Sequence, residues 1–335
     1  MKYFFLSVLL LFTLFGCKSK KESAEFFKRG NYHFKKNELD KAEHFFTESI
    51  KKTPDFADAY NNRGVVFLKR GNTDKALKDF EKAVNLDASF VDAKFNLAKI
   101  LSESGEYKRA EMIFKSLESK MKNSSDFYNQ MGQNTIRQNH FDEGLKLLEN
   151  SLSLNPGNVE TLTNISYLFL IQNREDEALK FVDKALKINP DFGFALNNKA
   201  VISGRNRSFK EAINLLEKAL LNDPKNLVFI NNLTLYYLEN KDLENGLIYL
   251  QKAQKIDEAN PYTLRNMGAY LFYSGKNTEA LKVFQQIERS NPEVDHIYYF
   301  LALNTASLKD KTSACKFRKR AEILSEPWLT ILPDC

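Results

Sequence analysis

Few side chains in this chain of 335 residues have the chemistry to bind metals or form covalent bonds. The four histidines, His33, His44, His140 and His296, show no metal-ligand spacing. The sequence also holds no glycine-rich phosphate loop, no nucleophile elbow and no paired metal motif. We therefore expect no catalytic residues, no metal site, no cofactor and no small-molecule substrate, and we predict that the protein is not an enzyme.

Three cysteines occur, and the first stands at the end of an apolar N-terminal segment. Lys2 supplies a positive charge, residues 3–15 are almost wholly apolar, and Gly16 places a small residue before Cys17. A helix over residues 3–15 rises about 20 Å, which is short of the roughly 30 Å hydrocarbon core of a bilayer. We therefore predict a secretory signal peptide over residues 1–16 rather than a transmembrane span.

The pair Gly16 and Cys17 resembles the lipobox of bacterial lipoproteins, in which a small residue precedes a cysteine that becomes the lipidated N-terminus. Phe15 departs from that pattern, because the second residue before the cysteine is usually small or aliphatic. The resemblance implies that Cys17 carries a lipid and that residues 17–22 form a short tether, which reaches at most roughly 22 Å. The alternative is an ordinary signal peptide followed by a cysteine without lipid.

Cys315 and Cys335 remain once Cys17 is assigned to lipid attachment. Export places the chain in an oxidising compartment, where these two cysteines form a natural pair. A disulfide across a loop of this length stabilises the folded state by roughly 3 kcal/mol in the chain-entropy model. We predict this disulfide, and two free thiols in a reducing compartment are the alternative.

Charged residues of both signs are interspersed along the chain, with 49 Lys and Arg against 43 Asp and Glu and a formal net charge of +6. Nucleic-acid binders usually concentrate their basic residues on one stripe or arm. The densest basic runs here are residues 18–21, beside the predicted anchor, and residues 316–320. We expect the first run to touch anionic lipid headgroups and the second to form the polar face of a last helix. No nucleic-acid partner is expected.

From Ser23 to Trp328 the chain repeats itself every 34 residues, nine times without a gap. Position 20 of every repeat is alanine or glycine. Position 8 is small in all nine, namely Gly30, Gly64, Ala98, Gly132, Ser166, Ala200, Thr234, Gly268 and Ala302. Because helices pack 8–10 Å apart only where side chains permit it, these positions mark where two helices of one repeat meet.

Other positions predict where the helices end and what lies between them. Position 24 is a large apolar residue in the first eight repeats, four residues after the small position 20 and therefore on the same helical face. Proline at position 32 of five repeats separates the second helix from the next repeat. Glycine or asparagine at position 15 predicts the end of the first helix, at Asn37, Gly71, Gly105, Asn139, Asn173 and Gly275.

This pattern resembles the tetratricopeptide repeat family. The resemblance implies an all-α fold, a right-handed α-solenoid of nine contiguous 34-residue helix-turn-helix repeats, at 23–56, 57–90, 91–124, 125–158, 159–192, 193–226, 227–260, 261–294 and 295–328. No repeat has Trp at position 4, repeats two, three, seven and nine lack the proline, and Arg318 replaces the apolar residue of the last repeat. A polar substitution suits a terminal, capping repeat. We expect Pro327, Trp328 and the tail 329–335 to lie over its exposed edge.

Position 6 carries an amide in seven consecutive repeats, although asparagine is a mediocre helix former. The residues are Asn62, Asn96, Gln130, Asn164, Asn198, Asn232 and Asn266. In one interpretation these amides offer donors and acceptors to the backbone of an extended peptide. In the other, each amide bonds to the neighbouring repeat.

The family resemblance also implies that the first helices line a concave groove that binds protein or peptide partners. Further candidate groove residues are Tyr167, Ile171, Arg205 and Tyr273, at positions 9 and 13 of their repeats. An apolar strip bordered by amides favours a peptide or helix anchored by hydrophobic side chains. Tyr167 and Ile171 packed between neighbouring repeats are the alternative.

We therefore predict a lipid-anchored scaffold of the bacterial cell envelope that holds a protein or peptide of unknown identity and meets the membrane through its N-terminal lipid. The alternatives are an assembly factor for secretion, pilus or outer-membrane components, and a substrate-recognition partner of a separately encoded glycan-processing enzyme. Lys18, rather than Asp, follows Cys17, which in some bacteria implies transit to the outer membrane.

Overall fold

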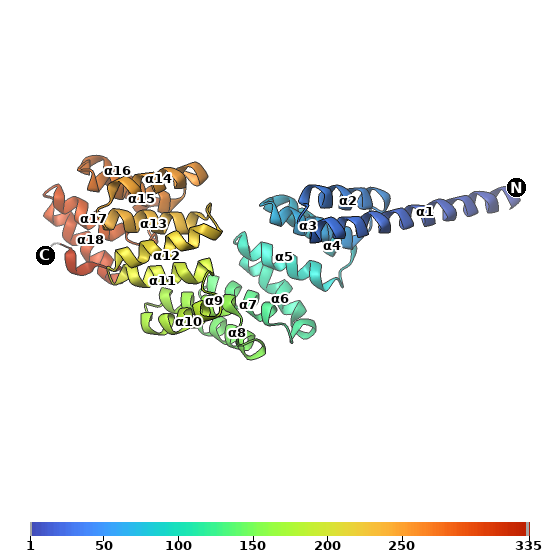
Figure 1. Cartoon of the computed structure of the whole chain (residues 1–335), viewed down its shortest axis with the longest axis horizontal. Helices are drawn as coiled ribbons and strands as arrows, with labels where there is room; N and C mark the ends of the chain where they lie inside the picture. The colour runs from blue at the N-terminus through green and yellow to red at the C-terminus, as the bar shows by residue number, and fades with distance from the viewer. Residues whose placement is uncertain (1, 333–334) are drawn as a thin grey trace. The chain divides into compact units, whose positions relative to one another are not determined.

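The computed structural model describes the backbone of residues 2–332 and 335, and the side chains from Ser19 onward within that range. In this part of the chain, eighteen α-helices and one short 3₁₀ helix are present and no strand occurs (Figure 1). This confirms the predicted all-α repeat fold. The signal segment and Cys17 lie outside the residues whose side chains are described.

The α-helices form nine consecutive pairs, one for each 34-residue repeat. The first helices are α1 (Lys2–Lys35), α3 (Ala57–Lys69), α5 (Val91–Glu103), α7 (Ser125–Arg137), α9 (Val159–Ile171), α11 (Gly193–Arg205), α13 (Leu227–Glu239), α15 (Pro261–Tyr273) and α17 (Ile297–Ser307). The second helices are α2 (Leu39–Lys52), α4 (Thr73–Leu86), α6 (Tyr107–Met121), α8 (Phe141–Leu154), α10 (Glu175–Ile188), α12 (Phe209–Asn222), α14 (Leu243–Asp257), α16 (Asn277–Ser290) and α18 (Lys311–Ile323). The 3₁₀ helix η1 (Leu329–Ile331) follows.

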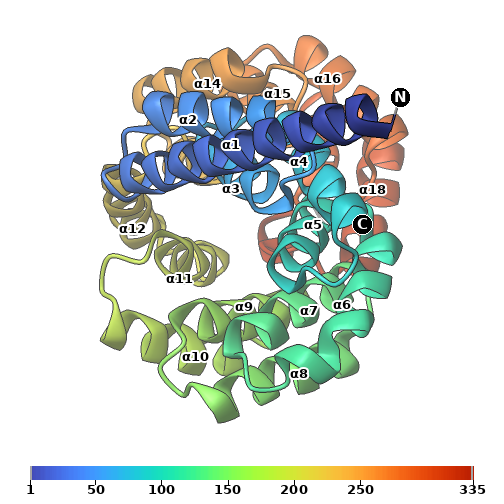
Figure 2. The ribbon, with the colours of Figure 1, turned by 90° about the vertical axis from the view of Figure 1, so that its right-hand side faces the viewer.

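The helices belong to two compact units. Unit 1 is Met1–Leu154 and contains α1 to α8, and unit 2 is Asn155–Cys335 and contains α9 to α18 with η1. Within each unit, every first helix contacts its own second helix, as α1 does along α2 in Figure 2, and also the first helix of the next repeat. Because the first helices lie close to one another, they form the inner layer of each unit.

Small and large residues interlock between the two helices of a repeat, as the repeat pattern predicts. A Cβ atom added at Gly30 would lie 2.6 Å from the ring of Phe46, and one at Gly64 would lie 2.7 Å from the ring of Phe80. Both phenylalanines, at position 24 of their repeats, are completely buried. A side chain at position 8 would therefore displace the ring that fills the space between the helices.

Each first helix is followed, two residues after its last residue, by a residue with left-handed backbone. All six glycines and asparagines that the sequence singled out at position 15 have positive φ, from 57° at Asn37 to 83° at Gly105. Arg207, Lys241 and Lys309, at position 15 of the other three repeats, adopt the same conformation, with φ of 59°, 65° and 64°. The repeat geometry therefore demands this turn even where the residue does not favour it.

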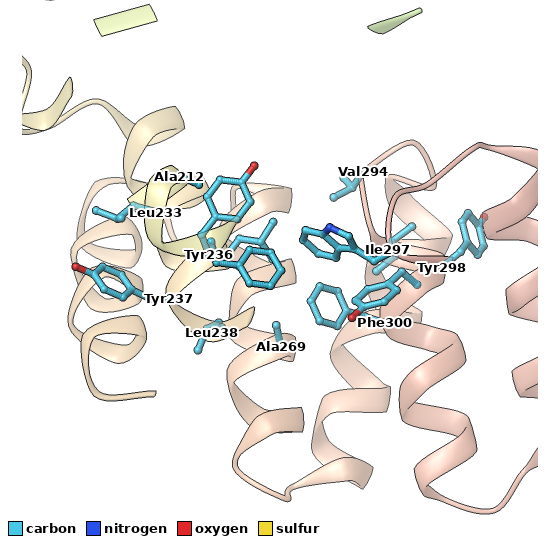
Figure 3. Packing of buried hydrophobic residues seen from close by; sticks show 14 of the residues in the cluster. Ala212, Leu233, Tyr236, Tyr237, Leu238, Ala269, Val294, Ile297, Tyr298 and Phe300 are labelled. Carbon is cyan, nitrogen blue, oxygen red and sulfur yellow. The ribbon is translucent and has the colours of Figure 1, made fainter. Parts of the chain in front are cut away.

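A large apolar core lies in unit 2 and extends from Leu196 to Leu332. Figure 3 shows part of it, with Tyr236 and Tyr237 leaving α13 in different directions and Ile297 and Phe300 coming from α17. Trp328, from the segment after α18, is part of this core and is only 6% exposed.

Candidate functional site

The position-6 amides are used within the protein. Asn96 Nδ2 donates to Asn61 Oδ1 at 2.9 Å in unit 1, and Asn232 Nδ2 donates to Asn197 Oδ1 at 2.8 Å in unit 2. In each case the acceptor is position 5 of the preceding repeat. Three other position-6 amides also donate to the preceding repeat. Asn198 Nδ2 donates to Thr163 O at 3.0 Å and Asn266 Nδ2 to Asn231 O at 2.8 Å, both at position 5. Asn62 Nδ2 donates to Asn31 Oδ1, at position 9, at 2.8 Å.

These bonds favour the interpretation in which the amides tie neighbouring repeats together. Gln130 differs, because its Nε2 reaches only Asp126 of its own helix, at 3.5 Å. Asn164 is not free either. Because these amide N–H groups already donate to other groups of the protein, fewer of them are available to the backbone of a bound peptide than the sequence alone implies.

Two further groove candidates are also held by internal contacts. Arg205 Nη1 donates to Leu170 O and Asn173 Oδ1, each at 3.1 Å, and so closes the end of α9. The hydroxyl of Tyr273 donates to Glu239 Oε1 at 2.5 Å, and the Lys241 ammonium lies 3.5 Å from the centre of its ring.

Glu239 is the centre of a buried polar group on the inner layer. It is 4% exposed and also accepts a hydrogen bond from the hydroxyl of Tyr299 at 3.4 Å. Burial raises the pKa of Glu239, while the bonds from the two tyrosine hydroxyls and the nearby Lys241 oppose that shift. The carboxyl group therefore joins α13, α15 and α17 rather than facing a ligand.

The inner layer of unit 2 exposes apolar side chains, three of them at position 2 of successive repeats. Phe194, Val228 and Tyr262 lie in the first turns of α11, α13 and α15, spaced by 34 residues, and are 52%, 52% and 39% exposed. Tyr167 and Ile171 of α9 are 51% and 40% exposed. We call these five residues the apolar face.

A signal for this face was present at position 2 of the repeats. Repeats two to five carry an acid there, at Asp58, Asp92, Asp126 and Glu160. An acid suits the first turn of a helix because of the helix dipole. The next three repeats lack this stabilising acid and carry Phe194, Val228 and Tyr262 instead. The change from acidic to apolar residues at position 2 is therefore visible in the sequence.

The aromatic members of the apolar face are supported from behind. The ring of Phe194 packs edge-on against Phe229, with ring centres 5.2 Å apart. The guanidinium of Arg265 lies 5.3 Å from the ring of Tyr262. Burial raises the pKa of the Tyr262 hydroxyl and the nearby Asp295 raises it further, while Arg265 opposes the shift.

The segment after α18 follows the capping prediction in part. The 3₁₀ helix η1 contacts α18, and Leu332 is buried in the same core as Phe317 and Ala321 of α18. Trp328 instead lies on the inner layer, where its Nε1 donates to Gly204 O of α11 at 2.9 Å. Its ring packs edge-on against Phe209 and Tyr299, with ring centres 5.4 Å apart in both cases. The apolar interior offers the indole more contact than a single terminal helix does.

Glu326 and His296 complete the surroundings of Trp328. The backbone N–H groups of Tyr298 and Tyr299, in the first turn of α17, donate to the Glu326 carboxyl at 3.3 and 2.7 Å. His296 precedes α17 with φ of 66°, and its ring centre lies 4.4 Å from that of Trp328. Neither ring nitrogen of His296 has a hydrogen-bond partner.

Burial perturbs both titratable groups beside Trp328. It raises the pKa of Glu326 to about 7, although the two backbone N–H groups favour the ionised form. It lowers the pKa of His296 well below its ordinary value, an effect that Arg265 and Arg205 reinforce and the Asp295 backbone opposes. Both groups therefore tend towards their neutral forms in the folded protein.

A disulfide joins Cys315 of α18 to Cys335, with their Cα atoms 5.5 Å apart. The same segment is held at a second point, because Arg318 Nη1 donates to Leu332 O at 3.2 Å. The predicted lipid-attachment residue Cys17 lies outside the described side chains. Among the helices that are described, none is long and apolar enough to cross a bilayer. The described side chains include no group of three His, Cys, Asp or Glu arranged to hold a metal ion.

Comparison with known proteins supports the repeat architecture. A family model described as tetratricopeptide repeat matches residues 57–90, and a second model with the same description matches residues 129–191. A chain in the crystal structure of the APC/C hetero-tetramer Cut9–Hcn1 resembles 90% of this chain over 73% of its own length, with a TM-score of 0.62 and 13% identity. A thermophilic TPR protein of Thermus thermophilus resembles 54% of this chain over 99% of its own length, with a TM-score of 0.50 and 19% identity. No curated protein matches the chain in sequence.

Proposed function

We propose that the chain holds an apolar peptide segment of a partner protein on the apolar face of unit 2. The chain is a solenoid built from tetratricopeptide repeats, an architecture that serves as a scaffold for protein interactions. The observation that carries the proposal is the row of exposed Phe194, Val228 and Tyr262, one on each of three successive first helices. Exposed apolar side chains that recur in register on one surface mark an interaction site.

The spacing of the row indicates the kind of peptide it accepts. Neighbouring packed helices lie about 8–10 Å apart. A polyproline II segment rises about 3.1 Å per residue and brings every third side chain to the same face, about 9 Å apart. A peptide with one apolar residue at every third position therefore matches one side chain to each helix of the row, whereas the alternation of a β-strand does not.

A labelled peptide tests the proposal directly. The probe is a proline-rich peptide with leucine at every third position, and the control peptide has the same composition with leucine at every second position. We expect Val228→Asp to weaken binding of the probe at least tenfold, because a charge would enter the centre of the row. Leu221→Asp is the matched control, since Leu221 is 81% exposed on the second helix α12, outside the row. Fluorescence anisotropy measures binding, and equal effects of the two variants would contradict the proposal.

We also propose that Cys17 anchors the protein to the bacterial cell envelope, with the outer membrane favoured. The support is the sequence of the N-terminal segment, its basic start, apolar run and Gly16 before Cys17. Cys17→Ser should move the protein from the membrane fraction to the soluble fraction and abolish labelling by a clickable palmitate analogue. A variant that stays in the membrane fraction would reject the lipid anchor.

The form of the partner complex separates a scaffold from an assembly factor. A partner that stays bound through purification supports the scaffold, because its complex must persist. Transient capture of exported subunits, trapped only by crosslinking from position 228, would support the assembly factor instead. Capture of a glycan-processing enzyme would support the substrate-recognition alternative.

A further inference from the structure

The segment after α18 occupies part of the inner layer of unit 2 as a ligand would. After α18 ends at Ile323, the chain places three side chains, Glu326, Trp328 and Leu332, into the interior. Glu326 is 8% exposed and Trp328 is 6% exposed, whereas Thr330 and Ile331, which follow them, are exposed. The contacts are thus made by a few side chains of an otherwise surface-lying segment.

Two polar contacts give this occupied surface its chemical specificity. The first is the pair of N–H groups of Tyr298 and Tyr299, which hold the carboxyl of Glu326 at 3.3 and 2.7 Å in the first turn of α17. The free N–H groups and the dipole of a helix N-terminus favour an acidic group there. The second is the carbonyl of Gly204, which accepts the indole N–H of Trp328 at 2.9 Å. Phenylalanine has no donor for this carbonyl.

The surface around the indole is shaped by three aromatic rings, one from α12 and two from α17 and the residue that precedes it. Phe209 begins α12, His296 precedes α17 and Tyr299 belongs to α17. The ring nitrogens of His296 are buried without hydrogen-bond partners, so this residue faces the indole rather than a polar network. Trp328 itself has φ of 68°, which is unusual for a bulky residue and indicates that the surrounding contacts hold it in place.

We propose that the surface formed by Gly204, Phe209, His296 and the first turn of α17 is a peptide site for a segment with an acidic residue two positions before a tryptophan, and that Glu326 and Trp328 are its tethered occupant. The inference deepens the proposed peptide-binding function and rests on it. The disulfide from Cys315 to Cys335 and the bond from Arg318 to Leu332 keep the occupant close. A tether of this kind gives an effective concentration in the millimolar range, so a free peptide competes only when the tail is weakened.

The test uses the full chain and a fluorescein-labelled peptide with the sequence of residues 325–332. Trp328→Ala vacates the indole surface while leaving the repeats in place. We expect the labelled peptide to bind this variant at least tenfold more tightly than it binds the oxidised wild-type chain. Replacing the glutamate or the tryptophan of the peptide by alanine should each weaken binding at least fivefold. Equal binding to variant and wild type would overturn the proposal, because the tail would then be an integral part of the fold.

A second measurement uses the wild-type chain, in case loss of the indole prevents folding of the variant. Trp328 is the only tryptophan of the chain, so acrylamide quenching of its fluorescence reports whether it is seated. The disulfide is first reduced, and an excess of the 325–332 peptide is added with non-fluorescent 4-fluorotryptophan in place of tryptophan. We expect this peptide to displace Trp328 and raise quenching at least twofold, and the same peptide with phenylalanine, which lacks the N–H donor, to raise it less. Unchanged quenching would overturn the proposal.

The apolar face provides the control that separates the two proposals. Val228→Asp should leave binding of the 325–332 peptide to the Trp328→Ala chain unchanged, because Val228 is not among the residues around the indole. Failure of this peptide alone, with normal binding of the proline-rich probe, overturns the tail site and leaves the proposed function standing. Failure of the proline-rich probe alone overturns the apolar face.

Discussion

Replacing Glu326 by glutamine should change how the stability of unit 2 depends on pH. The Glu326 carboxyl is buried beside Trp328, and its pKa is about 7 in the folded protein against an ordinary value of 4.5. Desolvation is the main cause, Asp295 adds to it, and the N–H groups of Tyr299 and Tyr298 and the charge of Arg265 oppose it. The folded state therefore binds the proton of this group more tightly than the unfolded state does.

The sign and size of the effect follow from that difference. A carboxyl whose pKa is raised in the folded state contributes its full stability below pH 4.5 and loses it as the pH rises through about 7. The interval between these two pKa values corresponds to about 3 kcal/mol of unfolding free energy. His296 acts in the opposite direction, because its lowered pKa stabilises the folded state only above its ordinary value of 6.5. The wild-type profile therefore contains opposing slopes, and Glu239, with its raised pKa, adds to the slope of Glu326.

The contributions of His296 and Glu239 cancel when the unfolding free energy of the wild type is subtracted from that of Glu326→Gln at each pH. Urea unfolding, followed by the fluorescence of the single tryptophan, gives the free energy of unfolding of each protein at each pH. We expect Glu326→Gln to gain about 3 kcal/mol relative to wild type between about pH 4.5 and about pH 8. Glu258→Gln, which removes an exposed carboxylate just after α14, corrects for the change in net charge. A difference that stays constant across this range, or that falls, would refute the reasoning.

Three further substitutions test other parts of the structure by urea unfolding. Cys335→Ser should lower the unfolding free energy by roughly 3 kcal/mol, because the disulfide closes a loop with a sequence separation of 20; thiol titration that finds both cysteines free in the wild type would contradict this. Asn232→Ala should cost about 1–2 kcal/mol, since the buried Oδ1 of Asn197 loses its donor, and a neutral result would mean that the amides do not tie the repeats. Gly204→Ala should cost about 1–3 kcal/mol, because its Cβ would overlap the buried ring of Tyr236; unchanged stability would show that this ring can move.

The repeat register could be read from the sequence because it depends on contacts at fixed spacing. Gly30 lies opposite Phe46, and Gly64 opposite Phe80, because the two helices of one repeat are close in the chain. The period of 34 residues also predicted where first helices end, at the glycines and asparagines of position 15. Arg207, which adopts the same left-handed turn, could be located only by its place in the repeat, since its residue type does not favour that conformation.

The candidate site depends on the tertiary structure more than the fold does. The amide row was recognised, but whether Asn232 faces a ligand or Asn197 depends on the distance between neighbouring helices, which no residue type states. The exposed Phe194 and Val228 were missed because they depart from an acidic position rather than repeat a motif. Tyr273 was selected by its position alone, and its bond to Glu239 shows that a groove position can be filled by the protein itself.

By itself, the sequence determined that the chain forms paired helices with a 34-residue period, because periodic small and large residues act between segments that adjoin in the chain. It also singled out the residues of the predicted anchor and the pair Cys315 and Cys335. Only the tertiary structure decided where Trp328 lies. Its contact with Gly204 spans 124 positions of sequence, and such a contact forms only because successive repeats of unit 2 curve until segments far apart in the chain share one interior.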